Sequence, residues 1–404
     1  MKESGIDWIG QIPEEWEVTK LKYALLISNG KDYKDIEVKE GGYPVIGSGG
    51  AFARSRNYMY DGDVVLLGRK GTIDKPLFYS GKFWTVDTMF YSTALNENNI
   101  KFMYYSSLLI PFSYYSTATA LPSMTQSDLN NHMLCLPSIS EQTKIADFLD
   151  KKTAQLDKAK SLLEEQIQKL KDYRASLIYE TVTKGLDKNV PMKDSGIDWI
   201  GQVPQGWGVK PLKYLIKFKN GYAFDSKLLT MEQTGVKVIR IGDFKPSGID
   251  FNAALNVFTS FNSKIDFYRI RKSQILIAMS GATVGKISFV NQEPNVYSVI
   301  NQRVGIIESE INKWIYYCLS TDSFTSYIQL NSNGSAQPNI SSSEISDFKV
   351  GIPDDVVIQK CVKYLDNQLE SINKLIQIKN QQIENINKQR QTLIYDYVTG
   401  KRRV

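Results

Sequence analysis

Few side chains in this sequence have the types and spacing that catalysis needs. His132 is the only histidine, which excludes a histidine-based triad and a multi-histidine metal site, and we expect a structural role for it. Glu37 and Lys39 form a Glu-x-Lys pair of the kind that nucleases use with an upstream aspartate. Because such triplets are common by chance, this pair supports a divergent nuclease only as an alternative.

Two glycine-rich stretches fall short of nucleotide-binding loops. In GATVGKI, residues 281–287, only three residues separate the glycines, Ile287 replaces the required Ser or Thr, and the following ISFV is strand-like. IGSGGAF, residues 46–52, is more typical of an ordinary loop, and the Asn/Asp-Pro-Pro-Tyr/Phe string of amino-methyltransferases is absent. We therefore expect no catalytic residue, no metal and no cofactor in this chain, and no enzymatic activity of its own.

Composition and charge are those of an ordinary globular protein of two or three domains. The 404 residues are 42% hydrophobic and 23% charged, with a polar N-terminus and no apolar run long enough to span a membrane. Cys135, Cys318 and Cys361 are odd in number and far apart, which favours a reducing cytoplasm over a disulfide framework or a zinc site. The net charge of +6 fits a solvated surface and, equally, a basic patch that attracts phosphates.

The sequence contains an internal repeat. SGIDWIGQIPEEW, residues 4–16, returns as SGIDWIGQVPQGW at residues 195–207, with ten of thirteen positions identical. A second block matches VVLLGRKGTIDKPLFY, from Val64, with ILIAMSGATVGKISFV, from Ile275, and a third matches residues 122–137 with 338–353. The ends of the two halves are similar and their middles diverge, which is the pattern of one scaffold with two specificities. Pseudo-twofold symmetry of this kind suits a two-part target.

Each half closes with a long segment of helical period. Apolar residues recur at heptad spacing, which predicts a coiled coil, and two separate amphipathic helices most simply pair with each other. The predicted seam consists of Leu149, Leu156, Leu163, Leu170 and Leu177 in the first half and Leu365, Leu369, Ile372, Ile376, Ile383, Ile386 and Leu393 in the second. Five polar residues interrupt this stripe: Thr153, Lys160, Arg174, Lys379 and Arg390. Their long side chains either extend outward from a weak coil, or these polar layers fix register or face partner subunits.

The ends of these helices can be located in the sequence. Ser138 and Glu141 form a candidate capping box, Asp354 is a candidate N-cap, and Gly185 and Gly400 stand where helix-ending glycines are expected. About 43 residues at a rise of 1.5 Å make each rod roughly 65 Å long, which is the length of a spacer.

Short apolar runs between turn clusters fill residues 30–137 and 221–353, and aromatic helices are expected from Lys101 and from Lys313. The predicted fold class is therefore α+β, with two homologous globular domains and two long helices that pair with each other. The predicted boundaries are residues 1–140 for the first domain, 141–185 for the first helix, 186–353 for the second domain and 354–404 for the second helix.

This layout resembles the DNA-specificity subunit of type I restriction–modification systems along essentially its whole length. The two opening strings, GSAQPNIS from Gly334 with its echo TALPSMTQ from Thr119, and LIYE and LIYD before the two helix ends carry the resemblance. It implies that each domain recognises one half of a bipartite DNA target and that the two long helices pair antiparallel and set the gap between the half-sites. It also implies two methyltransferase subunits and restriction or motor subunits as partners, with S-adenosylmethionine, ATP and Mg²⁺ bound by those partners.

Base edges and phosphates are contacted by Arg, Lys, Asn, Gln, Ser and Thr side chains on loops that reach a groove. For any one candidate a solvated surface role is at least as plausible, but the set concentrates in the divergent middles. The candidates are Arg54, Arg56, Arg69, Lys70 and Thr72 in the first domain and Arg240, Lys245, Ser280, Thr283, Lys286, Asn301, Gln302, Arg303, Gln337 and Asn339 in the second. We expect Gln337 and Asn339 to position backbone.

The main alternative is a coiled-coil adaptor with two protein-binding domains and no DNA role. A gel-shift with the purified chain and its methyltransferase partner, at a stated salt concentration, distinguishes the two hypotheses. For a DNA-specificity subunit, we expect that inserting four residues after Lys184 lengthens the recognised gap and leaves both half-site sequences unchanged.

Overall fold

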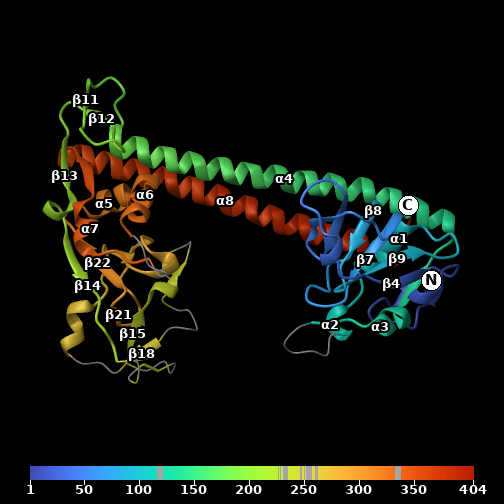
Figure 1. Ribbon diagram of the computed structural model, residues 1–404. Coiled ribbons are helices and arrows are strands. Elements are labelled where there is room, and N and C mark those ends of the chain that lie inside the picture. Colours follow the sequence, from blue (N-terminus) through green and yellow to red (C-terminus); the bar gives the residue numbers. More distant parts are fainter. Residues whose placement is uncertain are drawn as a thin grey trace. The chain divides into compact units, whose positions relative to one another are not determined.

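The computed structural model describes residues 1–115, 122–225, 227, 229–230, 235–245, 248–249, 251, 257–259, 263–332 and 338–404. These residues divide into two compact units (Figure 1). The first unit is Met1–Glu164 with Lys379–Val404, and the second is Glu165–Ile378. Each unit therefore contains one globular domain and part of both long helices.

A six-stranded sheet forms the centre of the first unit, in the order β4-β9-β7-β8-β5-β6. All neighbours are antiparallel except β5 and β8. The strands are β4 (Leu25–Asn29), β5 (Tyr43–Gly47), β6 (Gly50–Ser55), β7 (Tyr60–Gly68), β8 (Leu77–Thr85) and β9 (Met89–Ala94). The helices α1 (Ile100–Ser107), α2 (Phe112–Tyr115) and α3 (Gln126–Asn131) follow, with the short ladders β1 (Lys2–Glu3) to β2 (Gln11–Ile12) and β3 (Glu17–Lys20) to β10 (Met133–Leu136).

The second unit repeats this plan with its strands divided between sheets. One sheet has the order β14-β22-β19-β20 and another β18-β15-β21, in which β15 and β21 are parallel. The strands are β14 (Lys217–Asn220), β15 (Val236–Ile239), β18 (Val257–Thr259), β19 (Ile275–Ala278), β20 (Ile287–Phe289), β21 (Ser298–Ile300) and β22 (Val304–Glu308). The helices are α5 (Asn312–Leu319), α6 (Asp322–Asn331) and α7 (Ser342–Asp347), and the short ladders are β11 (Met192–Asp194) to β12 (Gln202–Pro204), β13 (Gly208–Pro211) to β23 (Lys349–Ile352) and β16 (Phe244–Lys245) to β17 (Gly248–Ile249).

The strand registers correct the sequence alignment of the second repeat block by one residue. Val65 pairs with Ser92 in the first unit as Ile275 pairs with Ile307 in the second, so Val65 rather than Val64 is the counterpart of Ile275. Side chains alternate between the faces of a strand, so a slip of one residue would exchange the two faces. Val65 and Ile275 both belong to the core that includes the long helices, whereas Val64 belongs to the core on the opposite face.

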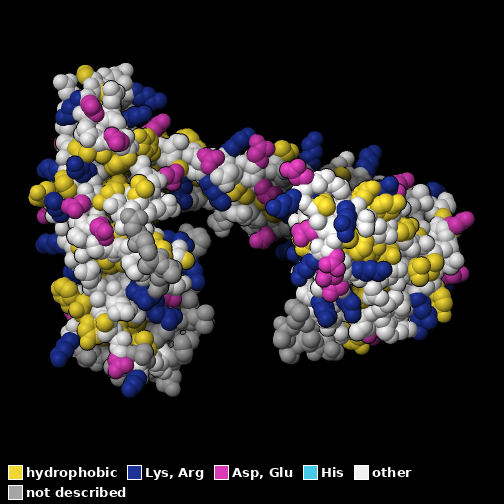
Figure 2. All heavy atoms as spheres, in the orientation of Figure 1, with side chains coloured by type: hydrophobic (Ala, Val, Ile, Leu, Met, Phe, Trp, Pro, Cys, Tyr) yellow, Lys and Arg dark blue, Asp and Glu magenta, His cyan; other side chains and the backbone are white. Residues whose placement is uncertain are grey.

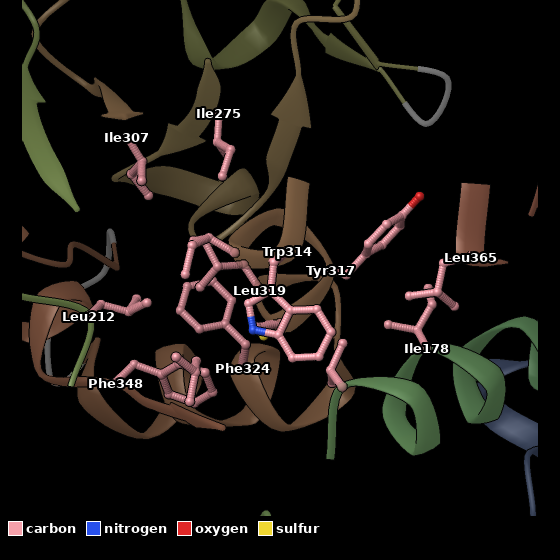
Figure 3. Packing of buried hydrophobic residues seen from close by; sticks show 14 of the residues in the cluster. Ile178, Leu212, Ile275, Ile307, Trp314, Tyr317, Leu319, Phe324, Phe348 and Leu365 are labelled. Atoms are coloured by element: carbon pink, nitrogen blue, oxygen red, sulfur yellow. The ribbon is translucent and has the colours of Figure 1, made fainter. Parts of the chain in front are cut away.

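Aromatic side chains fill the core of the second unit beneath its sheet (Figure 3). Trp314 of α5 is fully buried, and its indole N–H donates to the carbonyl of Gly351 at 3.0 Å. Ile178 and Leu365 meet at the edge of this cluster, so the long helices are part of the domain core (Figure 3).

The two long helices are α4 (Ile139–Lys184) and α8 (Asp355–Val398), of 46 and 44 residues. Asp354 caps α8, because its carboxylate accepts the backbone N–H of Val357 at 2.9 Å. Ser138 accepts the backbone N–H of Glu141 at 3.3 Å, while the Glu141 carboxylate accepts the indole N–H of Trp16 at 3.1 Å. Gly185 and Gly400 have positive φ of 74° and 71°, as helix-ending glycines do.

Within each unit the helices pair in antiparallel orientation, as predicted. In the first unit, residues near the start of α4 pack beside residues near the end of α8, with the rings of Phe148 and Tyr397 4.5 Å apart. In the second unit, residues near the end of α4 pack beside the first half of α8. Arg390 forms an ion pair with Asp157 of the other helix at 3.5 Å.

Every predicted seam residue is buried or half-buried. Leu149, Leu177, Leu365, Leu369 and Ile372 are buried, and the other predicted seam leucines and isoleucines are intermediate. Ile167, which the prediction omitted, is also buried at 8% exposure. The α+β fold class with paired long helices is therefore confirmed.

Candidate nucleic-acid interface

Three strand ends of the second unit bring most of its predicted contact residues together. The backbone N–H of Asn301, after β21, donates to Ile239 at the end of β15 at 2.9 Å. The N–H of Met279, after β19, donates to the carbonyl of Arg303 at 2.9 Å, and the Thr283 hydroxyl donates to the carbonyl of Ile241 at 3.4 Å. The loops 240–245, 279–286 and 301–303 therefore form one group, which we call the second-unit loop group.

A shallow pocket of about 240 Å³ lies within this group. Its lining residues are Arg240, Ile241, Asn301, Gln302 and Arg303. Gln302 and Arg303 are exposed, and Arg240 and Asn301 are half-buried. These are amide and guanidinium side chains, which hydrogen-bond to the major-groove edges of adenine and guanine.

The second-unit loop group carries more basic than acidic side chains. Arg240, Lys245, Lys286 and Arg303 are basic, and the two lysines and Arg303 are exposed. The acidic side chain among them, Asp243, is buried, where it accepts the backbone N–H of Arg240 at 2.8 Å. Asp243 thus stabilises the short helix of residues 241–243 and lies 4.0 Å from Arg240 Nε. The two lysines and Arg303 face solvent, where phosphate contacts are possible.

The third repeat block supports the loop after β19 through its backbone. The N–H of Gly281 donates to the carbonyl of Pro338 at 2.9 Å, and Ser280 forms an isolated bridge with Asn339. The hydroxyl of Ser280 is buried and makes no hydrogen bond within the described part of the chain. Asn339 thus lies beside the loop after β19 through its backbone, and a role in positioning that backbone stays a prediction. Gln337 lies outside the described residues.

The first unit builds the same support with different side chains. The N–H of Arg69 donates to Thr88 at 2.8 Å, and that of Gly71 donates to Pro122 at 2.8 Å. Lys70 and Thr72 are exposed on this turn. The guanidinium of Arg69 donates to the carbonyl of Asp87 at 3.3 Å. Residues 69–72 with 86–88 form the first-unit loop group, the counterpart of the group above.

Arg54 and Arg56 lie apart from the first-unit loop group. They stand at the opposite end of the β5–β6 hairpin, because β5 begins opposite Ser55 and ends opposite Gly50, near the loop group. The Arg54 guanidinium donates to the carbonyls of Gly41 and Gly42, the latter at 2.8 Å, and Arg56 donates to the carbonyl of Asp35 at 3.1 Å. Both side chains therefore hold loop backbone, and DNA contact by either stays a prediction.

Comparison with known sequences identifies the protein family to which a chain with these two loop groups belongs. The sequence model described as the type I restriction modification DNA specificity domain matches residues 13–171 and, a second time, residues 204–385. The chain belongs to this family. Each match covers one strand-end loop group and part of the long helix that follows it, so the specificity domain occurs twice, as the internal repeat predicted.

The chain also aligns over nearly its whole length with known specificity subunits. The MjaVIII type I restriction enzyme specificity subunit of Methanocaldococcus jannaschii is 24% identical, over 98% of this chain and 94% of its own. The EcoBI specificity subunit of Escherichia coli is 21% identical, over 99% and 89%. A solved chain from a study of complex assembly and conformational transition in the type I restriction–modification system superposes with a TM-score of 0.71 at 14% identity, over 96% of this chain and 98% of that one, and this likeness supports the fold. These comparisons give the specificity domains a role in DNA target recognition and no support to the adaptor alternative.

His132 of this specificity subunit has a structural environment. Its ring stacks on Trp8 with centroids 6.3 Å apart, and its Nδ1 lies 2.9 Å from the Tyr115 hydroxyl. Burial lowers the pKa of His132 to about 4, so the ring is neutral at physiological pH. Phe348 holds the same place in the second unit, stacked on Trp199 with centroids 4.9 Å apart.

The other chemically capable residues are dispersed or buried. Among the described residues no group of three or more His, Cys, Asp or Glu side chains could hold a metal ion. Cys135, Cys318 and Cys361 are buried, and burial raises the pKa of each thiol. Residues 287–289 after the GATVG turn form strand β20, as the sequence indicated. The IGSGGAF stretch forms the end of β5, the turn and the start of β6, so the expectation of an ordinary loop holds only for residues 48–49. No helix in the described residues is long and apolar enough to cross a membrane.

The basic excess is spread over both units. On the face drawn in Figure 2, Lys and Arg side chains occur on both units and alternate with Asp and Glu side chains. The charge pattern of that face is thus mostly that of a solvated surface, and the local excess at the second-unit loop group is the more informative feature.

One pair of contacts escaped the sequence analysis. In each unit a lysine and a tyrosine of the globular domain meet an aspartate of a long helix. The signal was the echo of KFMYY, from Lys101, in KWIYY, from Lys313. Their aspartate partners lie about fifty positions further on, a separation that sequence pattern alone does not connect.

Proposed function

We propose that each strand-end loop group reads one half of a bipartite DNA sequence. The observation that carries this proposal is that the two units have the same strand arrangement but different side chains at the ends of matching strands. Ile46 pairs with Thr85 in the first unit as Ile239 pairs with Ile300 in the second. The residues that follow are then Gly47 and Val86 in the first unit against Arg240 and Asn301 in the second. Two domains with the same strand arrangement and different side chains at these positions are suited to two different half-site sequences.

The chemistry of the two groups favours different contacts. Arg240, Gln302 and Arg303 surround the pocket of the second group and can form paired hydrogen bonds with guanine or adenine. Lys70 and Thr72 of the first group have compact donors, which suit phosphate oxygens as well as base edges. Ser280, Thr283, Lys286 and Lys245 would then hold the DNA backbone beside the second group.

The helix pair would set the gap between the half-sites. Half-sites one turn of DNA apart are separated by about 34 Å, and a rigid spacer is needed to fix such a distance. A flexible linker would instead allow a range of spacings. Continuous helices of 46 and 44 residues, joined by an apolar seam in each unit, have the required stiffness.

The chain would recognise DNA and leave the chemistry to its partners. Two methyltransferase subunits would bind S-adenosylmethionine, and restriction or motor subunits would supply ATP- and Mg²⁺-dependent cleavage. This division agrees with the buried thiols and the neutral, packed His132. The divergent-nuclease alternative makes a simple counter-prediction, since Glu37→Ala should then abolish cleavage by the assembled complex.

The experiment begins by mapping methylated bases in the host with and without this gene. The proposal expects a bipartite sequence that loses methylation when the gene is deleted. Purified chain with its methyltransferase partner should then bind a duplex carrying that sequence more tightly than a scrambled one, at salt concentrations of about 50 and 200 mM. Equal binding of both duplexes would refute DNA recognition and leave the adaptor alternative.

A further inference from the structure

Each globular domain is joined to a long helix by a polar cluster, which we call the joint. In the first unit, the Tyr105 hydroxyl of α1 donates to Asp150 Oδ1 of α4 at 2.8 Å. Lys101 Nζ forms an ion pair with the other carboxylate oxygen of Asp150, and it lies 5.5 Å from the centre of the Phe78 ring. One carboxylate on the long helix thus receives two donors from the globular domain.

The second unit contains the same joint between α5 and α8. Tyr317 donates its hydroxyl proton to Asp366 Oδ1, and Lys313 Nζ lies 3.2 Å from the same oxygen. Lys313 also lies 4.4 Å from the centre of the Phe289 ring. Phe289 pairs with Ile275 as Phe78 pairs with Val65. The lysine, tyrosine, aspartate and phenylalanine of the joint therefore occupy matching positions in the two units.

The tyrosine–aspartate bond is the strong element of the joint. Tyr105 and Tyr317 are 2% and 3% exposed, and burial raises the pKa of both hydroxyls, which therefore keep their protons and donate. A hydrogen bond to a carboxylate in such a site costs more to break than a neutral one. The lysine side chains are 41% and 29% exposed, so each ion pair contributes less by itself.

The joint has a geometric consequence that apolar packing lacks. Methyl and ring contacts resist separation, but they are non-directional and allow small rotations. Two donors that converge on one carboxylate fix both the rotation of the domain about the helix and its position along it. Both units keep this pair of donors on an aspartate of a long helix.

We propose that the joint is the positioning element that fixes the angle of each recognition domain on its helix, and so restricts DNA recognition to one gap length. This inference rests on the proposed function, because the gap has meaning only if both loop groups bind one duplex. Tyr105, Asp150, Tyr317 and Asp366 are positioning residues in this account and contact no DNA.

The two joints differ at a buried position beside the tyrosine, which provides an internal control. Thr153 of α4 is buried, and its hydroxyl lies 3.1 Å from that of Tyr105. The matching residue in α8 is Leu369, also buried, so Tyr317 lacks this second hydroxyl partner. Thr153→Leu therefore gives the first joint the composition of the second while keeping the bond to Asp150.

The test measures methylation by the assembled complex on duplexes that contain both mapped half-sites with the native gap, one base pair fewer or one more. Tyr105→Phe and Tyr317→Phe are each expected to lower the preference for the native gap about tenfold, with the half-site sequences unchanged. Thr153→Leu should lower it about threefold. Glu165→Gln removes an exposed ion pair with Lys169 on the same helix and should leave the preference unchanged.

Variants that lose activity equally on all three duplexes would show that the joint only stabilises the fold, and the inference would be overturned. An unchanged preference in Tyr105→Phe and Tyr317→Phe would overturn it as well. If either variant fails to assemble, Thr153→Leu decides alone, since it keeps the principal bond. A wild-type complex without a preferred gap would instead contradict the proposed function.

Discussion

The two recognition domains have the same strand arrangement and differ in the side chains at the strand ends. The turn after the central strand is held by the third repeat block in both, through Gly71 and Pro122 in one and Gly281 and Pro338 in the other. The neighbouring strand ends carry Gly47 in the first domain and Arg240 in the second. Backbone bonds and core contacts hold the strands in place, so side chains at the strand ends can change while the fold is kept.

The same comparison at a buried position teaches a different lesson. His132 and Phe348 both stack on the tryptophan of an opening string, Trp8 or Trp199. A flat ring is required at this place, but only the histidine adds a titratable group. The first domain should therefore respond to acid in a way that the second does not.

The largest difference between the domains is expected on acidification. The pKa of His132 is about 4 in the folded protein and about 6.5 when unfolded, so the unfolded state binds the proton first as pH falls. The free energy of unfolding should thus lose about 3 kcal/mol between pH 7 and pH 4 through this residue. His132→Phe should abolish that component, measured as the difference between denaturant unfolding curves of variant and wild type. Identical pH profiles for the two proteins would contradict this assignment.

A smaller difference is expected at the helix-ending glycines. A Cβ on Gly400 would lie 2.4 Å from Pro13 Cδ, whereas on Gly185 the nearest atom is Trp207 Cζ2 at 3.0 Å. Both positions have positive φ, so alanine is strained at either. Gly400→Ala should cost about 2 kcal/mol and Gly185→Ala about 1 kcal/mol in thermal unfolding. The reverse order would show that the opening strings pack differently from this description.

The smallest expected change in free energy is a loss of DNA discrimination, and it is the most informative about recognition. Arg303→Ala should lower discrimination at one half-site by about 1 kcal/mol, and Arg69→Ala should do so at the other half-site alone. Binding of duplexes with single base changes in each half-site measures this discrimination. Equal weakening on every sequence would identify the arginine as a phosphate contact, and loss at both half-sites would contradict one reader per domain.

Much of the fold could be predicted because it depends on local pattern. The heptad leucines from Leu149 to Leu177 predicted a helix and its buried stripe, and Asp354 predicted where the second helix begins. The strand register could not be predicted, because residues 64 and 65 are both valine and nothing nearby distinguishes the two faces.

The candidate site was predictable in composition but not in grouping. The sequence indicated Arg240, Thr283 and Arg303 as candidates, and the structure brings their loops together. The sequence did not indicate that the Arg54 guanidinium would donate hydrogen bonds to the carbonyls of Gly41 and Gly42, because that contact depends on how the hairpin folds. The bond between Tyr105 and Asp150 was hidden for the same reason, since 45 residues separate its partners.

The structure also shows that the insertion after Lys184, which tests the spacer, should be made at a different place. Lys184 precedes Gly185, which packs against Trp207, so four residues added there would disturb a domain as well as the helix. A heptad added after Glu164 in α4 and another after Ile378 in α8 keep the seam in phase. These sites are the boundaries between the two units.

Mapping of methylated bases in a host that carries this double insertion tests the central claim most directly. Seven residues at 1.5 Å add about 10.5 Å to the helix pair, or roughly three base pairs. The account predicts that both half-site sequences stay the same and that the gap lengthens by about three base pairs. An unchanged gap, or altered half-sites, would contradict it.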